Sequence, residues 1–99
     1  MLYFAYQYHG PIAIRYPRGS AYEGFKNMRP PIEYGKSERM FEGEKIALVA
    51  VGSMVQTAVQ VREKLLDKGI NATVVNARFV CPLDTECLDR LSRDHQWIV

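Results

Sequence analysis

Hydrophobic positions from residue 45 onward follow two periodicities that together indicate an α/β fold. Lys45–Val51 is a nearly continuous apolar run, typical of a parallel strand covered on both faces, and Gly52 then opens a turn. The next segment repeats apolar residues at helical spacing and stops at Gly69; the repeating positions are Met54, Ala58, Val61 and Leu65. Asn71–Phe79 is again rich in β-branched residues. Strand, helix and strand within this span predict a βαβ unit.

Polar residues mark where the two helices of this region begin. Ser53 and Gln56 are three residues apart, which predicts a capping box at the first helix. Asp84 is expected to cap a second helix that ends near Asp94. Residues 96–99 then predict a further strand, which we expect to form an exposed edge of the sheet.

The first 44 residues are less regular. Residues 1–8 predict the last turns of a helix, with Gly10 placed to adopt the left-handed conformation after its end. Residues 11–16 contain two isoleucines and precede Pro17, a pattern that predicts a short buried strand. Residues 19–44 combine glycine, consecutive prolines and many charges, and we expect a linker that holds one hairpin near residues 36–40.

Composition excludes several classes of function. A formal net charge of +2 in 99 residues, with scattered Lys and Arg, does not provide the continuous basic face needed for nucleic acid. No apolar run approaches the length that spans a bilayer, so we expect no membrane partner. Cys81 and Cys87 fit neither a zinc motif nor a disulfide framework. They are expected to be reduced thiols in a cytoplasmic protein.

The segment RYPRG carries the strongest candidate chemistry. Arg15 and Arg18 lie on either side of Pro17, at the carboxyl end of the predicted strand, where open α/β sheets bind ligands. Planar guanidinium groups suit a phosphate or a carboxylate. The alternative is a structural ion pair at a domain boundary. His9 and His95 both lie beside predicted helix ends, where a structural role is expected.

Three motifs, RYPRG, VAVGSMV and VVNARFVCPLD, occur in an order and at a spacing that resemble the 1-deoxy-D-xylulose-5-phosphate synthase family of the transketolase superfamily. The resemblance implies a three-layer α/β transketolase C-terminal-like domain over residues 45–99. It also implies that residues 1–19 are the last helix and strand of a pyrimidine-binding domain, and that residues 20–44 are an interdomain linker. Both domains would be incomplete.

The resemblance further implies a homodimeric enzyme that uses thiamine diphosphate and Mg²⁺. Such an enzyme condenses pyruvate with glyceraldehyde 3-phosphate for isoprenoid and thiamine biosynthesis. Arg15, and less directly Arg18, would contact the substrate phosphate. The family's catalytic, cofactor and metal ligands match no residue here, so we expect a fragment that is inactive alone. Alternatives are a piece of a transketolase or of a 2-oxo acid dehydrogenase β subunit, or a non-catalytic dimerisation module.

Overall fold

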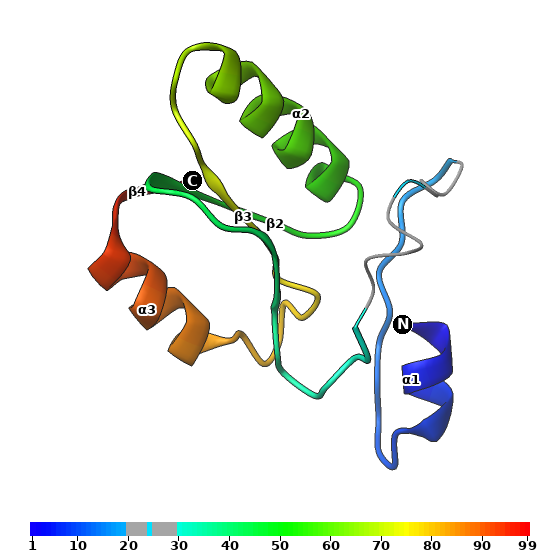
Figure 1. Cartoon of the computed structure of the whole chain (residues 1–99). Helices are drawn as coiled ribbons and strands as arrows, with labels where there is room; N and C mark the ends of the chain where they lie inside the picture. Colours follow the sequence, from blue (N-terminus) through cyan, green and yellow to red (C-terminus); the bar gives the residue numbers. More distant parts are fainter. Residues whose placement is uncertain (20–23, 25–29) are drawn as a thin grey trace.

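The computed structural model describes residues 1–19, 24 and 30–99, which form a mixed sheet with helices on both faces (Figure 1). The elements, in chain order, are α1 (Leu2–Gln7), β1 (Glu38–Phe41), β2 (Lys45–Ala50), α2 (Met54–Asp67), β3 (Thr73–Asn76), α3 (Thr85–Asp94) and β4 (His95–Ile98). Among the described residues, no helix is both long enough and apolar enough to cross a membrane.

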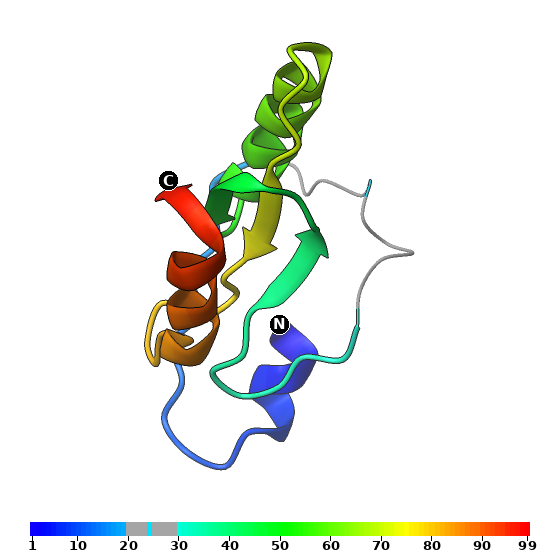
Figure 2. The ribbon, with the colours of Figure 1, turned by 60° about the vertical axis from the view of Figure 1, so that its left-hand side comes forward.

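The four strands have the order β1-β3-β2-β4. β2 pairs in parallel with both β3 and β4, whereas β1 pairs antiparallel with β3. The helices α2 and α3 each connect parallel strands, which is the arrangement expected of successive βαβ units. Figure 2 shows β1 along one side of the sheet and the end of the chain on the other. The α/β prediction is therefore confirmed.

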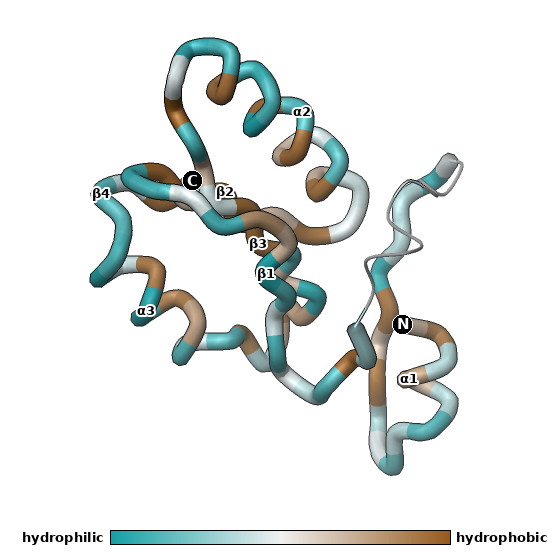
Figure 3. Tube along the Cα trace, in the orientation of Figure 1, coloured by the Kyte–Doolittle hydropathy of each residue, from teal (hydrophilic) through white to brown (hydrophobic). Residues whose placement is uncertain are grey.

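Strand alternation divides the core into two layers. Leu48 and Val74 face α2, where Ala58 completes the packing. Their neighbours Ala47 and Val75 face the opposite side and pack with Leu91 of α3. Successive side chains of a strand point to opposite faces, so two strands of alternating apolar residues supply both layers. Figure 3 shows the hydrophobic stretches of β2 and β3 between the two helices, which confirms the three-layer prediction.

The buried face of α2 agrees with the predicted one at Ala58 and Leu65 but is otherwise rotated from it. Met54 and Val61 are exposed, whereas Val55 and Ala58 are buried. Arg62 lies on this face; its guanidinium carbon is 4.5 Å from the centroid of the Phe41 ring. Its Nε also donates to the Ala72 carbonyl at 3.1 Å, so the charged head is satisfied while the stem covers apolar surface.

The predicted strand at residues 11–16 is wrong, because these residues have no regular secondary structure. A segment with high β-propensity forms a strand only when it pairs with a neighbouring strand, and no other described segment pairs with this one. The hairpin near residues 36–40 is also wrong. The single strand β1 pairs instead with β3, in the register Glu38 to Asn76. Local turn residues could not reveal that long-range partner.

The helix ends follow the sequence only in part. Ser53 has helical backbone angles and makes no capping hydrogen bond with its side chain, so the capping-box prediction is wrong. The carbonyl of Gly52 instead accepts from Val55 N at 3.2 Å. At the other end, Gly69 has φ +79°, as a left-handed stop requires. Asp84 caps α3 by accepting from Cys87 N, as predicted.

Four aromatic rings attach α1 to the rest of the molecule. Phe4 of α1 contacts Phe79 edge-on, with ring centroids 5.5 Å apart. Tyr8 stacks on Tyr34 at 5.3 Å, and Tyr34 in turn lies 5.9 Å from Phe79. We call these four residues the aromatic joint. Gly10 has φ +156° and lies beyond an extended Tyr8, so the left-handed cap predicted there is not formed.

Candidate functional site

The carboxyl ends of β2 and β3 meet at one edge of the sheet. Ala77 N donates to Ala50 O at 2.8 Å, which holds the two strand ends together. Because β1 is antiparallel, its first residue Glu38 lies at the same edge, opposite Asn76. In open α/β sheets this is the edge where ligands bind.

Arg78 occupies this edge and joins it to the segment before β1. Its Nη2 donates to Glu38 Oε2 at 2.8 Å, and both side chains are more than 90% buried. The same guanidinium donates to the carbonyls of Pro30 and Pro31 at 3.2 and 3.3 Å. A buried charge needs such partners, and Arg78 itself has φ +58°, a strained value for a residue with a side chain. The arginine thereby fixes residues 30–38 against the sheet.

The two predicted phosphate ligands lie elsewhere. Arg15 and Arg18 are exposed on the extended segment that follows α1. The argument from residue type and position assumed that the two arginines lie at the end of a buried strand. That assumption is wrong, because residues 11–16 form no strand. Among the described residues, no hydrogen bond or ion pair links Arg15 or Arg18 to Arg78, whose carboxylate partner is Glu38. Their phosphate role therefore rests on the resemblance alone.

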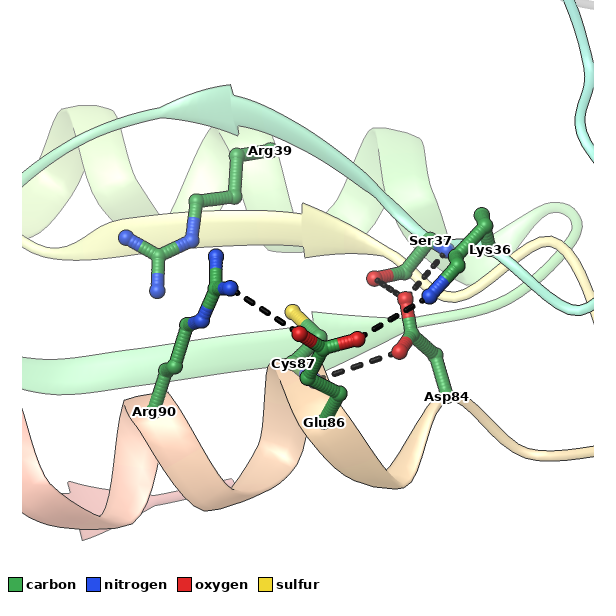
Figure 4. A pocket seen from close by; sticks show the side chains of 7 residues that line it. All are labelled: Lys36, Ser37, Arg39, Asp84, Glu86, Cys87 and Arg90. Atoms are coloured by element: carbon green, nitrogen blue, oxygen red, sulfur yellow. Dashed lines mark hydrogen bonds and ion pairs between the residues drawn. The ribbon is translucent and has the colours of Figure 1, made fainter.

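A polar hollow of about 350 Å³ lies between β1 and α3 (Figure 4). Arg39 enters it from β1, and Glu86 and Arg90 enter it from α3. Its full lining is Lys36, Ser37, Arg39, Asp84, Glu86, Cys87 and Arg90. The hollow thus combines residues from the segment around β1 with the first turns of α3.

Glu86 links two of the cations in this hollow. Its Oε2 accepts from Lys36 Nζ at 3.1 Å and its Oε1 accepts from Arg90 Nη2 at 3.0 Å. The hydrogen bond between Lys36 and Glu86 raises the pKa of Lys36 and lowers the pKa of Glu86. Both effects favour the charged forms, so Lys36 and Glu86 stay ionised at neutral pH. The side chains are half exposed or more, and solvent therefore screens the pairs.

Asp84 has a structural role at the same place. Burial alone would raise the pKa of its carboxyl, but hydrogen bonds from Ser37 and Cys87 outweigh this effect and lower the pKa. Ser37 donates from its backbone N at 2.8 Å and from its hydroxyl at 2.9 Å, both to Oδ2. Asp84 therefore caps α3 and fastens the residue before β1 to it.

Possible metal ligands and thiols lie among the described residues. The described residues contain no group of three His, Cys, Asp or Glu side chains that could hold a metal ion. Cys81 and Cys87 are free, in agreement with the prediction of unpaired thiols. His95 is structural, as expected: its Nδ1 is 3.0 Å from the carbonyl of Leu91 at the end of α3, and its Nε2 is 2.7 Å from Thr73 Oγ1.

Several of these residues escaped the sequence analysis. Arg78 lies near the carboxyl end of the strand predicted over residues 71–79, so its position at the carboxyl edge was a usable signal. Its burial and its partner Glu38, forty residues earlier, had no sequence signal. The hollow depends on β1 pairing with β3, and that pairing was missed together with the strand itself.

Comparison with known proteins agrees with the fold. The family model for the transketolase C-terminal domain matches residues 35–99, a match that begins before the expected boundary at residue 45 and includes β1. A solved structure of a split-gene transketolase, described as an inactive β4 tetramer, superposes with a TM-score of 0.66 and 30% sequence identity. The match covers 68% of this chain and 22% of that one.

Curated relatives match along the whole sequence. The 1-deoxy-D-xylulose-5-phosphate synthase of Lachnoclostridium phytofermentans is 50% identical over 99 residues, which is 100% of this chain and 16% of the relative. The synthase of Clostridium perfringens is 45% identical over 97 residues, or 95% and 15% of the two chains. The chain thus spans about a sixth of the length of these relatives. It belongs to the transketolase C-terminal domain family and is similar over its full length to 1-deoxy-D-xylulose-5-phosphate synthases.

Proposed function

We propose that this chain is part of a 1-deoxy-D-xylulose-5-phosphate synthase. The complete protein would be a transferase that condenses pyruvate with glyceraldehyde 3-phosphate, releasing CO₂ and forming 1-deoxy-D-xylulose 5-phosphate. The observation that carries this proposal is 50% identity to such a synthase across all 99 residues. That match includes residues 1–34, which lie outside the transketolase C-terminal match and are therefore not explained by that domain alone.

Within this proposal, residues 1–19 belong to a preceding pyrimidine-binding domain and residues 20–44 to an interdomain connection. The structural distinction between α1 and the sheet supports that division. The hydrogen bonds of Arg78 to Pro30 and Pro31, and of Asp84 to Ser37, support packing of the last part of this connection on the C-terminal domain. The complete protein would be a cytoplasmic homodimer.

Substrate phosphate binding is the role proposed for Arg15 and Arg18. Both side chains are exposed, so they can reach a ligand that lies between this segment and another part of a larger protein. Charge-assisted hydrogen bonds to phosphate contribute on the order of 1.5 to 3 kcal/mol each when the site excludes water. Such a site requires more surrounding protein than the exposed segment itself provides.

Thiamine diphosphate and Mg²⁺ would be bound by other parts of the complete protein. The described residues provide no cluster of carboxylate, histidine or cysteine ligands for Mg²⁺, so their donor set does not fit the metal. No catalytic step is assigned to residues of this chain. We therefore propose that the 99 residues are inactive alone.

The test is an assay of the complete protein with pyruvate, glyceraldehyde 3-phosphate, thiamine diphosphate and Mg²⁺. We expect deoxyxylulose phosphate to form, and Arg15→Ala to raise the KM for the phosphorylated aldehyde more than tenfold with a smaller change in kcat. Arg18→Ala should act in the same direction but more weakly. Arg93→Ala, which removes an exposed arginine from α3, is the matched control and should leave both constants within about twofold.

One outcome would contradict the proposed reaction, and another would contradict the phosphate role of Arg15. A folded complete protein that forms no deoxyxylulose phosphate would exclude the synthase activity, and turnover of other transketolase or 2-oxo acid dehydrogenase substrates would identify the alternative. An unchanged KM in Arg15→Ala would remove Arg15 from the phosphate site while leaving the reaction assigned.

A second candidate function for the isolated chain is self-association. β4 lies at the edge of the sheet, and the apolar side chains of Trp97, Ile98 and Val99 are 67%, 43% and 76% exposed. An edge strand with exposed apolar residues is a template for pairing with another chain. The similar split-gene transketolase structure, described as an inactive tetramer, is a further reason to consider this candidate.

Sedimentation velocity over a hundredfold range of concentration tests this second candidate. We expect the isolated chain to shift from monomer toward dimer or larger species as concentration rises. Trp97→Lys should reduce that shift, because a lysine on an edge strand disfavours pairing between strands. A monomer at every concentration would exclude self-association of the isolated chain.

A further inference from the structure

The hollow between β1 and α3 contains more positive than negative charge. Lys36, Arg39 and Arg90 contribute three cations, whereas Asp84 and Glu86 contribute two carboxylates. The shifted pKa values of Lys36 and Glu86 keep both groups charged. The lining thus carries a net charge of +1 at neutral pH, and this charge is gathered within one concave surface.

Both carboxylates already have partners on the protein. The two oxygens of Glu86 accept from Lys36 and Arg90. The two oxygens of Asp84 accept from Ser37 and from the first turn of α3. All four carboxylate oxygens therefore already accept hydrogen bonds from protein groups, and neither carboxylate pairs with Arg39.

Arg39 is the cation that remains. Within residues 1–19, 24 and 30–99, its guanidinium makes no ion pair or side-chain hydrogen bond. Figure 4 shows this group extending from β1 toward the guanidinium of Arg90 on α3, so two like charges face each other across the hollow. Two planar groups with several unused N–H donors, placed on opposite walls, match the geometry of a tetrahedral oxyanion.

We propose that this hollow binds a phosphate group. Arg39 and Arg90 contact the phosphate oxygens from the two walls, and Lys36 adds a third positive charge at the rim. The volume of about 350 Å³ accommodates a small phosphorylated molecule as well as the free ion. The site is separate from the exposed segment that carries Arg15 and Arg18, and it depends on the pairing of β1 with β3 rather than on the proposed synthase activity.

The first measurement is a titration of the full 99-residue chain, labelled with ¹⁵N, with inorganic phosphate, diphosphate and glycerol phosphate at constant ionic strength. We expect saturable shifts at the amides of Ser37, Arg39 and Cys87. Arg39→Gln and Arg90→Gln should each raise the Kd by about three- to tenfold. This effect is smaller than that of losing a buried charge-assisted hydrogen bond, because solvent screens the charges at this exposed site. Tighter binding of glycerol phosphate than of inorganic phosphate would indicate a phosphorylated metabolite; the reverse would indicate the free ion.

The matched control is Arg93→Gln. Like Arg90→Gln it removes one positive charge from α3, but Arg93 does not line the hollow. It should change the Kd by less than twofold. Equal weakening by Arg93→Gln and Arg39→Gln would show unspecific attraction of the anion to surface arginines and would overturn the proposal. Shifts centred on residues 15–18 and abolished by Arg18→Gln would overturn it too, because the phosphate would then bind to the N-terminal segment.

The spectra also control for folding. Arg39 and Arg90 are exposed, so their variants should retain the dispersed amide spectrum of the sheet. As a second variant, Arg39→Lys preserves the charge but loses the planar fork, and its Kd should lie between those of the wild type and Arg39→Gln. A folded wild-type chain without saturable shifts would exclude the phosphate site.

Discussion

The region from β1 to β4 and the segment of residues 1–19 differ in how they bury apolar side chains. Among the described residues, all nine buried hydrophobic residues lie from Ala47 to Leu91, whereas α1 has none. In α1, Leu2 and Tyr6 are 76% and 88% exposed. Burial of apolar surface is the main favourable contribution to folding, so the sheet region provides the stability and the N-terminal segment depends on it.

The difference shows that similar local patterns can have different outcomes. Residues 11–16 and β2 both present short apolar runs. β2 has β3 on one side and β4 on the other, and its side chains meet a helix on each face. Residues 11–16 have no such neighbours among the described elements. A strand is a property of a pair of segments, which explains why one prediction is confirmed and the other is wrong.

The largest effect is expected from the core of the sheet region. Leu91→Ala removes a fully buried side chain that packs on Ala47 and Val75, and it should lower the free energy of unfolding by about 3 kcal/mol. Leu66→Ala, in a residue that is 42% exposed, is the matched control and should lower it by less than about 1 kcal/mol. Urea unfolding followed by circular dichroism measures both. Equal effects would mean that the α3 side is not a packed core.

The next effect concerns the buried ion pair at the carboxyl edge. Glu38→Gln leaves Arg78 buried without its carboxylate, and we expect a loss of about 2 kcal/mol because the proline carbonyls remain as acceptors. Glu63→Gln, on the exposed side of α2, should change stability by less than about 0.5 kcal/mol. If both variants unfold at the same urea concentration, Arg78 does not fix residues 30–38.

A smaller effect is expected at the start of α3. Asp84→Asn weakens the cap and the hydrogen bonds from Ser37, and it should cost about 1 kcal/mol at pH 7. Because the pKa of Asp84 is lowered in the folded chain, this stabilisation is present above the unfolded value of 3.8 and is lost as pH falls through the folded value. The wild type and Asp84→Asn should therefore begin to converge in stability only below the unfolded value of 3.8, as the pH falls through the lower pKa of the folded carboxyl. A constant difference down to pH 2 would contradict the assignment.

The smallest effect on the sheet is expected from the aromatic joint. Phe4→Ala removes the ring that contacts Phe79, so α1 should detach while the unfolding free energy of the sheet changes by less than about 1 kcal/mol. Nuclear Overhauser contacts between α1 and Phe79 should disappear. Tyr3→Ala, in a residue that is 74% exposed on the same helix, should preserve these contacts. Their survival in Phe4→Ala would show that α1 is held by other interactions.

Much of the fold was predictable from the sequence because its signals are local. The apolar run of β2, the cap at Asp84 and the stop at Gly69 each depend on a few neighbouring residues, and all three predictions are confirmed. β1 was missed as a single strand because its four residues join the sheet only through a partner more than thirty residues away.

The candidate sites were less predictable for the same reason. The resemblance supplied Arg15 and Arg18, but neither their exposure nor the absence of a strand there could be deduced from the motif. The apolar face predicted for α2 was misplaced because Arg62, a charged residue, occupies a position on the packed face by stacking on the ring of Phe41. Binary patterning assigns arginine to the surface and therefore rotates the predicted face.

Hydrogen exchange on the full 99-residue chain tests the contrast between the two regions most directly. We expect the amides of β2, β3, α2 and α3 to exchange slowly, at rates set by unfolding of the sheet, and those of residues 11–18 to exchange nearly as fast as in an unstructured peptide. Comparable protection at residues 12–16 would contradict this account. It would show that these residues form a strand after all and that the N-terminal segment contributes to the same cooperative unit as the sheet.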